Sequence, residues 1–516
     1  MTVSLNRRSL VKFAGGSTAV MLTGAAPRTI LAQDGAESQT GELVIGKGQE
    51  AVGFDPAMVT AASSFELISV VYERLVYFDE NGEAQPELAE SWENPDDLTF
   101  IFTLRPNVTF HNGNSLTAED VKFSVDRIKD EANASPWASQ FAPVDAVEVT
   151  ADQTVTFRLN APYGPFLATL SAAYASILPG GDPTIDFQTE MIGTGPFLLE
   201  SWEQDTETVM AAHTSYWNPE EPLLETLRWL ILPDESARLA AIRTGEIHIT
   251  SIADPLTVES AMDSEGVRVI VQDTTDYYLL GFNCAEPPFD DPNVRRALAL
   301  AIDREAIVEA VFFGRGQVTG PIVPTLGDWV QPAEQLPTYQ VDREKAKSML
   351  EEAGASGLSF KILVGSLYQE FTNIALVIQD QLSEIGVTVE LETVEWGTFI
   401  DRWVARDFQS FVSYNSSGND PDRALHTAFT TDGSVNAFQF SNEEVDRLLE
   451  SGRTTTDRES RKTIYQNAAI VLAEQAPAVF ICTRVGFFAV RANVHGFQPT
   501  AVQTWDTLSM TTIEEA

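Results

Sequence analysis

Apolar and polar residues along this chain recur with the periods of strands and helices. Every second residue from Leu98 to Leu104 is apolar, which predicts a half-buried strand. Residues 111–113 predict a turn, because the glycine there can supply a positive φ. Thr117, with Asp120 three residues later, predicts the N-cap of a helix. Residues 88–128 therefore predict a strand, a turn and a helix in succession.

Strands and helices alternate again in the second half of the chain. A strand predicted at Tyr277–Asn283 precedes the most regular helical pattern, which Asp291 caps, Pro292 opens and Gly314 ends. The segments predicted after it are helix 342–353, strand 358–364, helix 368–385, strand 387–393, a helix after the capping box 441–444, helix 457–474, and strands 477–482 and 485–490. This alternation favours a mixed or mainly parallel sheet covered by helices.

The first 32 residues have the pattern of an export signal. Basic residues at Arg7, Arg8 and Lys12 precede an apolar segment from Phe13 to Ala26 that falls short of the about 18 residues a spanning helix needs. Residues 6–12 resemble a twin-arginine motif, which implies export of the folded chain. We expect cleavage near Gln33 and, since no Cys follows the apolar segment, no lipoprotein anchor.

The charge balance limits the partners. The chain has 33 basic and 75 acidic residues, a formal net charge of −42, which argues against nucleic acid and against anionic membranes. Among the basic residues Arg outnumbers Lys. An acidic, Lys-poor surface suits a salty medium, where screening relieves self-repulsion; this is a hypothesis about habitat.

The sequence contains no motif that assembles a catalytic or metal centre. It has no CxxC, HExxH or GxSxG and no Walker-type phosphate loop, and its five His are scattered without metal-ligand spacing. We therefore expect no enzyme and no cofactor. A secreted hydrolase is kept as a remote alternative, because Ser, His and Asp are all present.

Residues 88–128 resemble the signature of the extracytoplasmic solute-binding proteins of peptide-type ABC importers (family 5), the dipeptide and oligopeptide binders. The matching residues are Ala89, Ser91, Trp92, Phe100, Leu104, Arg105, Phe110, His111, Gly113, Thr117, Ala118, Asp120 and Val121. Further matches are the runs 54–56, 71–75, 192–197, 215–217, 232–238 and 245–247.

The resemblance implies an α/β, two-lobed periplasmic-binding-protein fold (class II-like). Lobe one is expected at residues 33–280, with an extra β-rich subdomain at about 62–192. Lobe two is expected at 281–484, and residues 485–516 return to lobe one. The chain is then expected to cross between the lobes twice, near 275–283 and near 484–490, to form a hinge.

The resemblance also implies where a solute binds. In lobe one it points to Thr60, Ala61, Ala62 and Ser63; the alternative is a helix start capped by Ser63 or Ser64. In lobe two the candidates are an aromatic residue and a polar loop, namely Trp396, Tyr414, Asn415, Ser416, Ser417 and Asn419. The alternative there is a polar surface loop with core aromatics.

One position departs from the family. Typical peptide binders have an Asp a few residues before Asp420-Pro421-Asp422, where it pairs with the α-amino group of the ligand. This chain has Ser417 there, or Ser416 if the register slips, and a hydroxyl lacks the charge that holds an ammonium group. A blocked or modified peptide, an opine-like or sugar-like solute, or a peptide anchored by another carboxylate therefore stay open.

The two cysteines, Cys284 and Cys482, lie next to the expected crossings, which are side by side in the family. A disulfide between them and two buried free thiols are both open.

The expected function is an extracytoplasmic solute receptor of an ABC importer. It would close two lobes on a small solute, a di- or oligopeptide or a peptide-like compound, and deliver it to the permease subunits. The alternatives are a receptor of the same fold for an opine, a sugar or a metal chelate, or a sensory or chaperone role. We expect a monomer in the periplasm or another extracytoplasmic space.

Overall fold

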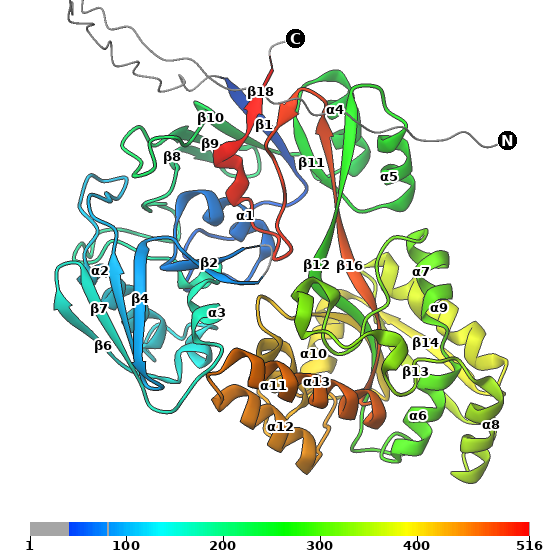
Figure 1. Cartoon of the computed structure of the whole chain (residues 1–516). Coiled ribbons are helices and arrows are strands. Elements are labelled where there is room, and N and C mark those ends of the chain that lie inside the picture. The colour runs from blue at the N-terminus through cyan, green and yellow to red at the C-terminus, as the bar shows by residue number, and fades with distance from the viewer. Residues whose placement is uncertain (1–40, 80–81, 515–516) are drawn as a thin grey trace, which may run out of the picture. The chain divides into compact units, whose positions relative to one another are not determined.

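The computed structural model describes residues 41–79 and 82–514, so the predicted export signal lies outside the described residues. Within these ranges ten strands form one mixed sheet in the order β14-β13-β15-β12-β16-β11-β1-β10-β9-β8. The long strands β12 (Val267–Phe282) and β16 (Ala478–Arg491) lie in its middle, between the strands of the two lobes (Figure 1).

Lobe one holds one half of this sheet. β12 and β16 pair with each other, and β16 continues the sheet to β11 over residues 487–490. The elements of this half are β1 (Glu42–Lys47), α1 (Ala62–Val71), β8 (Phe197–Glu203), β9 (Glu207–Ala212), β10 (Thr226–Ile231), α4 (Glu235–Thr244), β11 (Ile249–Ile252) and α5 (Pro255–Met262). Ala61 is the N-cap residue of α1, without a side-chain hydrogen bond, so a cap at Ser63 or Ser64 is wrong.

A β-rich subdomain belongs to the same lobe. Its four-stranded sheet has the order β4 (Ala89–Asp96), β5 (Thr99–Leu104), β7 (Thr154–Leu159), β6 (Val144–Ala151), and α2 (Ala118–Lys129) packs against it. The smaller elements of lobe one are β2 (Val76–Phe78), β3 (Ala84–Pro86), α3 (Phe166–Leu170), β17 (Val494–His495) and β18 (Thr512–Ile513). The predicted strand, turn and helix of residues 88–128 are confirmed. Asp120 accepts from the backbone N–H of Thr117 at 2.8 Å, as the predicted helix start requires.

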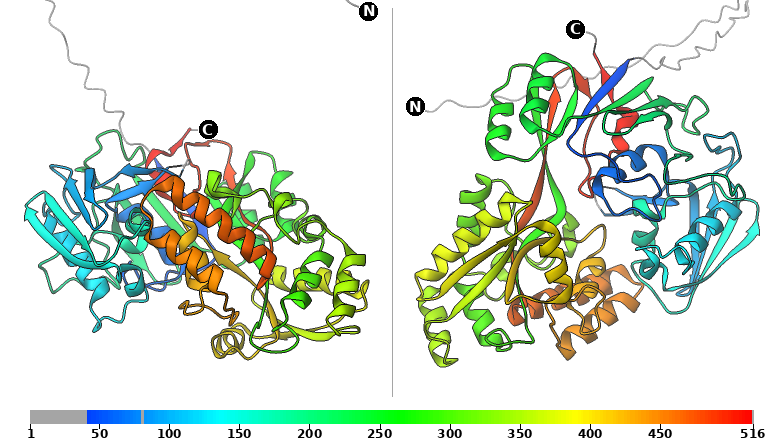
Figure 2. Two further views of the ribbon diagram at one scale, coloured as in Figure 1. Left: turned by 60° about the horizontal axis from the view of Figure 1, so that its bottom comes forward. Right: turned by 180° about the vertical axis from the view of Figure 1, so that it is seen from behind.

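Lobe two holds the other half of the large sheet. β13 (Ser359–Gly365) is parallel to β14 (Thr388–Val394) and to β15 (Ser410–Ser416), which confirms the predicted parallel arrangement. The helices are α6 (Pro292–Ala301), α7 (Arg304–Phe312), α8 (Arg343–Glu352), α9 (Gln369–Ser383), α10 (Trp396–Ala405), α11 (Pro421–Phe429), α12 (Glu443–Thr454) and α13 (Arg458–Gln475). Figure 2 shows α12 and α13, in orange, beside the cyan subdomain of lobe one. No helix among the described residues is long and apolar enough to cross a bilayer.

Two predictions about element ends are wrong. The helix predicted from Pro292 to Gly314 is two helices, because Ile302 is extended and Asp303 starts a new helix by accepting from the N–H of Ala306. The two strands predicted at 477–482 and 485–490 are one strand, β16. The polar pair Thr483-Arg484 interrupts the apolar pattern without ending the strand.

Candidate ligand-binding cleft

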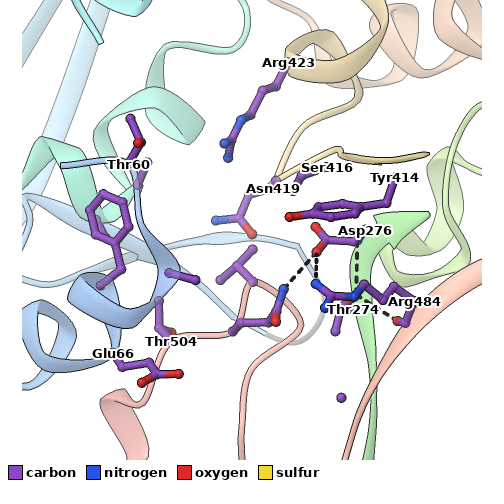
Figure 3. Close-up of a pocket in the computed structure, with 18 of the residues that line it drawn as sticks. Thr60, Glu66, Thr274, Asp276, Tyr414, Ser416, Asn419, Arg423, Arg484 and Thr504 are labelled. Atoms are coloured by element: carbon purple, nitrogen blue, oxygen red, sulfur yellow. Dashed lines mark hydrogen bonds and ion pairs between the residues drawn. The ribbon is translucent and has the colours of Figure 1, made fainter. Parts of the chain in front are cut away.

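A cavity of about 580 Å³ lies between the lobes (Figure 3). Lobe one contributes the start of α1, residues 163–174, residues 251–253 and the C-terminal segment 502–505. Lobe two contributes the end of β15 and the loop after it, and the middle of β12 and of β16 forms the floor between them. A site formed by both lobes and by the strands that join them changes shape when the lobes move.

The predicted segment of lobe one lies partly in this cavity. Thr60 and Ala62 line it, whereas Ala61 and Ser63 lie outside the lining. The carbonyl of Ser63 accepts instead from the ammonium of Lys47 at 2.5 Å. This contact ties the first turn of α1 to the end of β1.

The predicted segment of lobe two divides in the same way. Tyr414, Ser416 and Asn419 line the cavity, whereas Asn415 and Ser417 lie outside the lining. Successive side chains of a strand point to opposite faces, which separates Tyr414 and Ser416 from Asn415. Ser417 is only 1% exposed, and its hydroxyl has no hydrogen-bond partner among the described residues.

Trp396 supports the cavity without lining it. Its ring stacks on Phe399, with centroids 5.1 Å apart, and meets the edge of Tyr368 at 5.2 Å. Tyr368 does line the cavity and was missed by the sequence analysis. A matching aromatic wall in lobe one consists of Trp137 stacked on Tyr174, with centroids 4.4 Å apart.

Two further charged residues missed from the sequence lie at the floor, Asp276 of β12 and Arg484 of β16. Their side chains approach to 3.6 Å, and Gln503 donates to the Asp276 carboxylate at 3.0 Å (Figure 3). Arg484 is a charged residue within a mostly apolar strand, which is the signal that could have identified it, whereas Asp276 follows the polar residues 272–275 and carries no such signal. Burial, with Tyr368 nearby, raises the pKa of Tyr414 to about 12, so this phenol stays neutral beside them.

The acidic residues after the polar loop hold the loop in place. Asp420 forms a bidentate ion pair with Arg461, at 2.8 and 2.9 Å. Asp422 accepts from Arg453 at 2.6 Å and from the hydroxyl of Tyr465 at 2.7 Å. These buried pairs give Asp420-Pro421-Asp422 a structural role at the start of α11.

Hydrogen bonds also join the two lobes directly. The amide of Asn419 donates to the Ser171 hydroxyl at 3.2 Å, and Thr456 donates to Asp97 at 2.7 Å. The N–H of Gly164 donates to the Arg453 carbonyl at 2.8 Å. The structure therefore has its lobes in contact.

Both cysteines are free thiols in the structure, which corresponds to the second of the two interpretations left open. Burial raises the pKa of the Cys284 thiol to about 11 and that of Cys482 further above its ordinary value. Both thiols are therefore protonated at neutral pH and poor nucleophiles.

Two lobes on a shared sheet, with a cavity at the strands that join them, define the class of two-lobed solute receptors. The model of bacterial extracellular solute-binding proteins, family 5, matches residues 83–436. The chain belongs to this family. It is an extracytoplasmic solute receptor.

Known proteins of the family are similar over nearly the whole chain. The dipeptide-binding protein of Escherichia coli (strain K12) is 29% identical, over 96% of this chain and 97% of the relative. Heme-binding protein A of Haemophilus influenzae is 30% identical, over 86% of this chain and 88% of the relative. The solved structure of the periplasmic binding protein DppA from Helicobacter pylori, in complex with the peptide STSA, is 26% identical with a TM-score of 0.77, over 92% of this chain and 98% of that one.

Proposed function

We propose that this receptor binds a di- or oligopeptide, or a peptide-like compound, and delivers it to the permease subunits of an ABC importer. The observation that carries the proposal is the 580 Å³ cavity formed by both lobes and by the two strands between them. Its volume lies within the range of about 300–1,000 Å³ that small-molecule sites occupy. A solute held there contacts both lobes at once and so stabilises the closed arrangement.

The chemistry of the cavity suits a peptide. The aromatic walls at Trp137 and Tyr414 offer faces to apolar side chains, and the short polar side chains of Thr60, Ser416 and Asn419 offer donors and acceptors to amide groups. These three polar residues, with Ala62 and Tyr414, are the predicted site residues that we propose contact the solute. The related dipeptide-binding protein supports the same ligand class.

Heme is the ligand named for another relative, and the cavity favours it less. Its described lining contains no His, Cys or Met, which are common axial ligands of heme iron. Tyrosine remains as a ligand type, so the test must identify the bound solute and not only detect one.

Native mass spectrometry of freshly purified protein tests the ligand class, because a tightly held solute stays bound during gentle ionisation. A retained mass that fragments as a peptide supports the proposal, and a heme, sugar or opine mass contradicts it. Addition of the identified solute raises the melting temperature by mass action. Small-angle scattering then tests closure: an unchanged radius of gyration at saturating solute contradicts the closure mechanism.

The proposal extends to the organisation of the whole chain. We propose lobe one at residues 33–280 and 485–516, lobe two at 281–484, export by the twin-arginine route with cleavage near Gln33, and a monomer in the extracytoplasmic space. N-terminal sequencing of the exported protein tests the cleavage site. Replacement of Arg7 and Arg8 by Lys tests the route, since export that continues unchanged contradicts it.

A further inference from the structure

The hydrogen-bond ladder between β12 and β16 is interrupted where both strands pass the cavity. Three residues of β12, 274–276, oppose Arg484 alone on β16. Irregularities of this kind bend a strand and turn a side chain out of the regular alternation, and they are common next to binding sites. Asp276 and Arg484, the charged residues at this irregularity, both line the cavity.

Neighbouring segments hold the irregular backbone in shape. The Thr274 hydroxyl donates to the Arg484 carbonyl at 2.8 Å. The N–H of Thr275 donates to the Ala501 carbonyl, and the N–H of Ser417 donates to the Thr275 carbonyl, both at 2.9 Å. Because these groups are paired within the protein, the direction of the Asp276 side chain is fixed before any solute arrives.

The Asp276 carboxylate is buried and only partly paired. Its side chain is 7% exposed. Among the described residues its side-chain contacts both fall on Oδ2: Gln503 Nε2 at 3.0 Å and Arg484 Nη1 at 3.6 Å, the latter too long for a hydrogen bond. A carboxylate offers about four acceptor positions, so Oδ1 retains capacity for a donor. Gln503 makes its contact from the left-handed region, at φ 63°, a strained conformation that is common at ligand sites.

The Arg484 guanidinium also retains capacity. Its side chain is 27% exposed, and its Cζ lies 4.8 Å from the centre of the Tyr414 ring. Figure 3 shows the Tyr414 ring beside the Asp276–Arg484 pair, facing the cavity. A guanidinium has five N–H donors, and the loose ion pair leaves several of them for a solute oxygen.

We propose that Asp276 and Arg484 together bind an α-aminoacyl head group: a primary ammonium with a carbonyl or carboxylate oxygen on the adjacent carbon. The ammonium donates to Asp276, and the oxygen accepts from Arg484. This inference rests on the proposed peptide-type function and names the group by which the solute is held. In this arrangement Asp276, on β12, provides the carboxylate that is missing at Ser417.

The pairing of opposite charges explains the selectivity of such a subsite. A solute that carries only a cation is repelled by Arg484, and one that carries only an anion is repelled by Asp276. A head group with ammonium and oxygen a few ångströms apart satisfies both residues without opposing either. Two sources provide this chemistry: the N-terminus of a peptide and a free amino-acid head.

Calorimetric titration of the mature wild-type protein with three probes tests the inference and separates the sources. The probes are L-alanyl-L-leucine, its N-acetyl derivative and γ-L-glutamyl-L-leucine, whose head is a free amino acid. We expect a free-ammonium probe to bind at least about tenfold more tightly than the acetylated one. Preference for the α-linked dipeptide identifies a peptide N-terminus, and preference for the γ-linked one identifies an amino-acid head.

Comparison of Asp276→Asn with the control Asp273→Asn tests whether Asp276 is the residue that binds the ammonium group. Asp273 lies on the same strand and also accepts from a glutamine, Gln317 at 2.6 Å, but it lies outside the cavity lining. We expect at least about tenfold weaker binding for Asp276→Asn and a change within about twofold for Asp273→Asn. If Asp276→Asn does not fold, the comparison of free and acetylated dipeptide on the wild type decides.

Failure of this inference differs from failure of the proposed function. Equal binding of acetylated and free dipeptide, or unchanged affinity in Asp276→Asn, overturns the subsite while peptide binding stands. No binding of any of the three probes also overturns the subsite. A non-peptide mass retained by the purified protein overturns the proposed function itself.

Discussion

The β-rich subdomain and the cleft floor are both built from strands, yet their polar side chains differ in how completely they are hydrogen-bonded. In the subdomain, Asp120 accepts from the N–H of Thr117 and from the N–H of Gly180, at 2.8 and 2.7 Å, so both of its oxygens are paired. At the cleft floor, Asp276 has one hydrogen bond and a loose ion pair, both of them on Oδ2. Fully paired groups stabilise the fold, whereas partly paired groups are available to a solute. Substitutions in the two regions should therefore affect different measurements.

The largest expected effect is on stability, in the subdomain core. Phe102 is fully buried and meets Phe157 edge-on, with centroids 5.5 Å apart. Phe102→Ala leaves a cavity and should lower the free energy of unfolding by about 3–5 kcal/mol, measured by urea denaturation. At temperatures where the variant is folded, its solute affinity should match the wild type; a large loss of affinity would show that the subdomain and the cleft are coupled.

Glu73 is an exception in the subdomain, because only one of its two carboxylate oxygens is hydrogen-bonded. Its Oε1 accepts from Tyr216 and Trp217, at 2.8 and 2.9 Å, while its buried Oε2 has no partner among the described residues. Burial, with the nearby Glu87, raises its pKa to about 8. Its stabilising contribution is complete below the ordinary carboxyl pKa and is lost as the pH rises towards 8, because the unfolded chain releases the proton first.

Over that window the loss approaches about 1.4 kcal/mol for each pH unit. Glu73→Gln should flatten the dependence of unfolding free energy on pH between about 5 and 8, measured by urea denaturation at each pH. An unchanged slope in the variant would assign the pH dependence to another group.

A smaller loss of stability is expected from the start of α2. Asp120→Ala removes the acceptor of the Thr117 and Gly180 N–H groups and should cost about 1–2 kcal/mol. Asp126→Ala, on the exposed face of the same helix, is the matched control, with an expected change below about 0.5 kcal/mol. Equal effects of the two substitutions in thermal unfolding would contradict the structural role of Asp120.

The smallest expected effect is on solute affinity and concerns a hydrogen bond between the two lobes. Thr456 donates to Asp97 across the two lobes but lies outside the cavity lining. Thr456→Val should weaken solute binding about twofold, through the equilibrium between open and closed lobes, with almost no change in stability. Calorimetric titration measures this effect, and tighter binding in the variant would contradict closure through this contact.

The periodic patterns predicted much of the fold because the period of a half-buried strand or helix is a local property. The strand at Leu98–Leu104, the helix after Thr117 and the parallel strands of lobe two follow from such patterns. The patterns failed where tertiary contacts decide. Arg484 interrupts the apolar run of β16 and lines the cavity between the lobes, and Ile302 breaks a helical period that continues smoothly in the sequence.

The candidate site was predictable in its location and not in its detail. Family resemblance pointed to the segments at Thr60 and Tyr414, and the structure places members of both in one cavity. Which side chains of a segment face the cavity depends on the register of β15 against β12. The proximity of Asp276 and Arg484 depends on the pairing of strands far apart in the chain, of which the sequence shows only the charge of Arg484 within an apolar run.

The interrupted ladder lies where the two lobes join, and this position has a mechanical consequence. A point near the axis of a rotation moves least. A head group bound beside residues 274–276 is therefore displaced little by lobe closure, whereas the distant rims of the lobes move far. We therefore expect the head group of the solute to bind first, while the lobes are open, and the rotation of the lobes to enclose the rest of the solute afterwards. Solutes that share a head but differ in length would then share an association rate and differ in how long they stay.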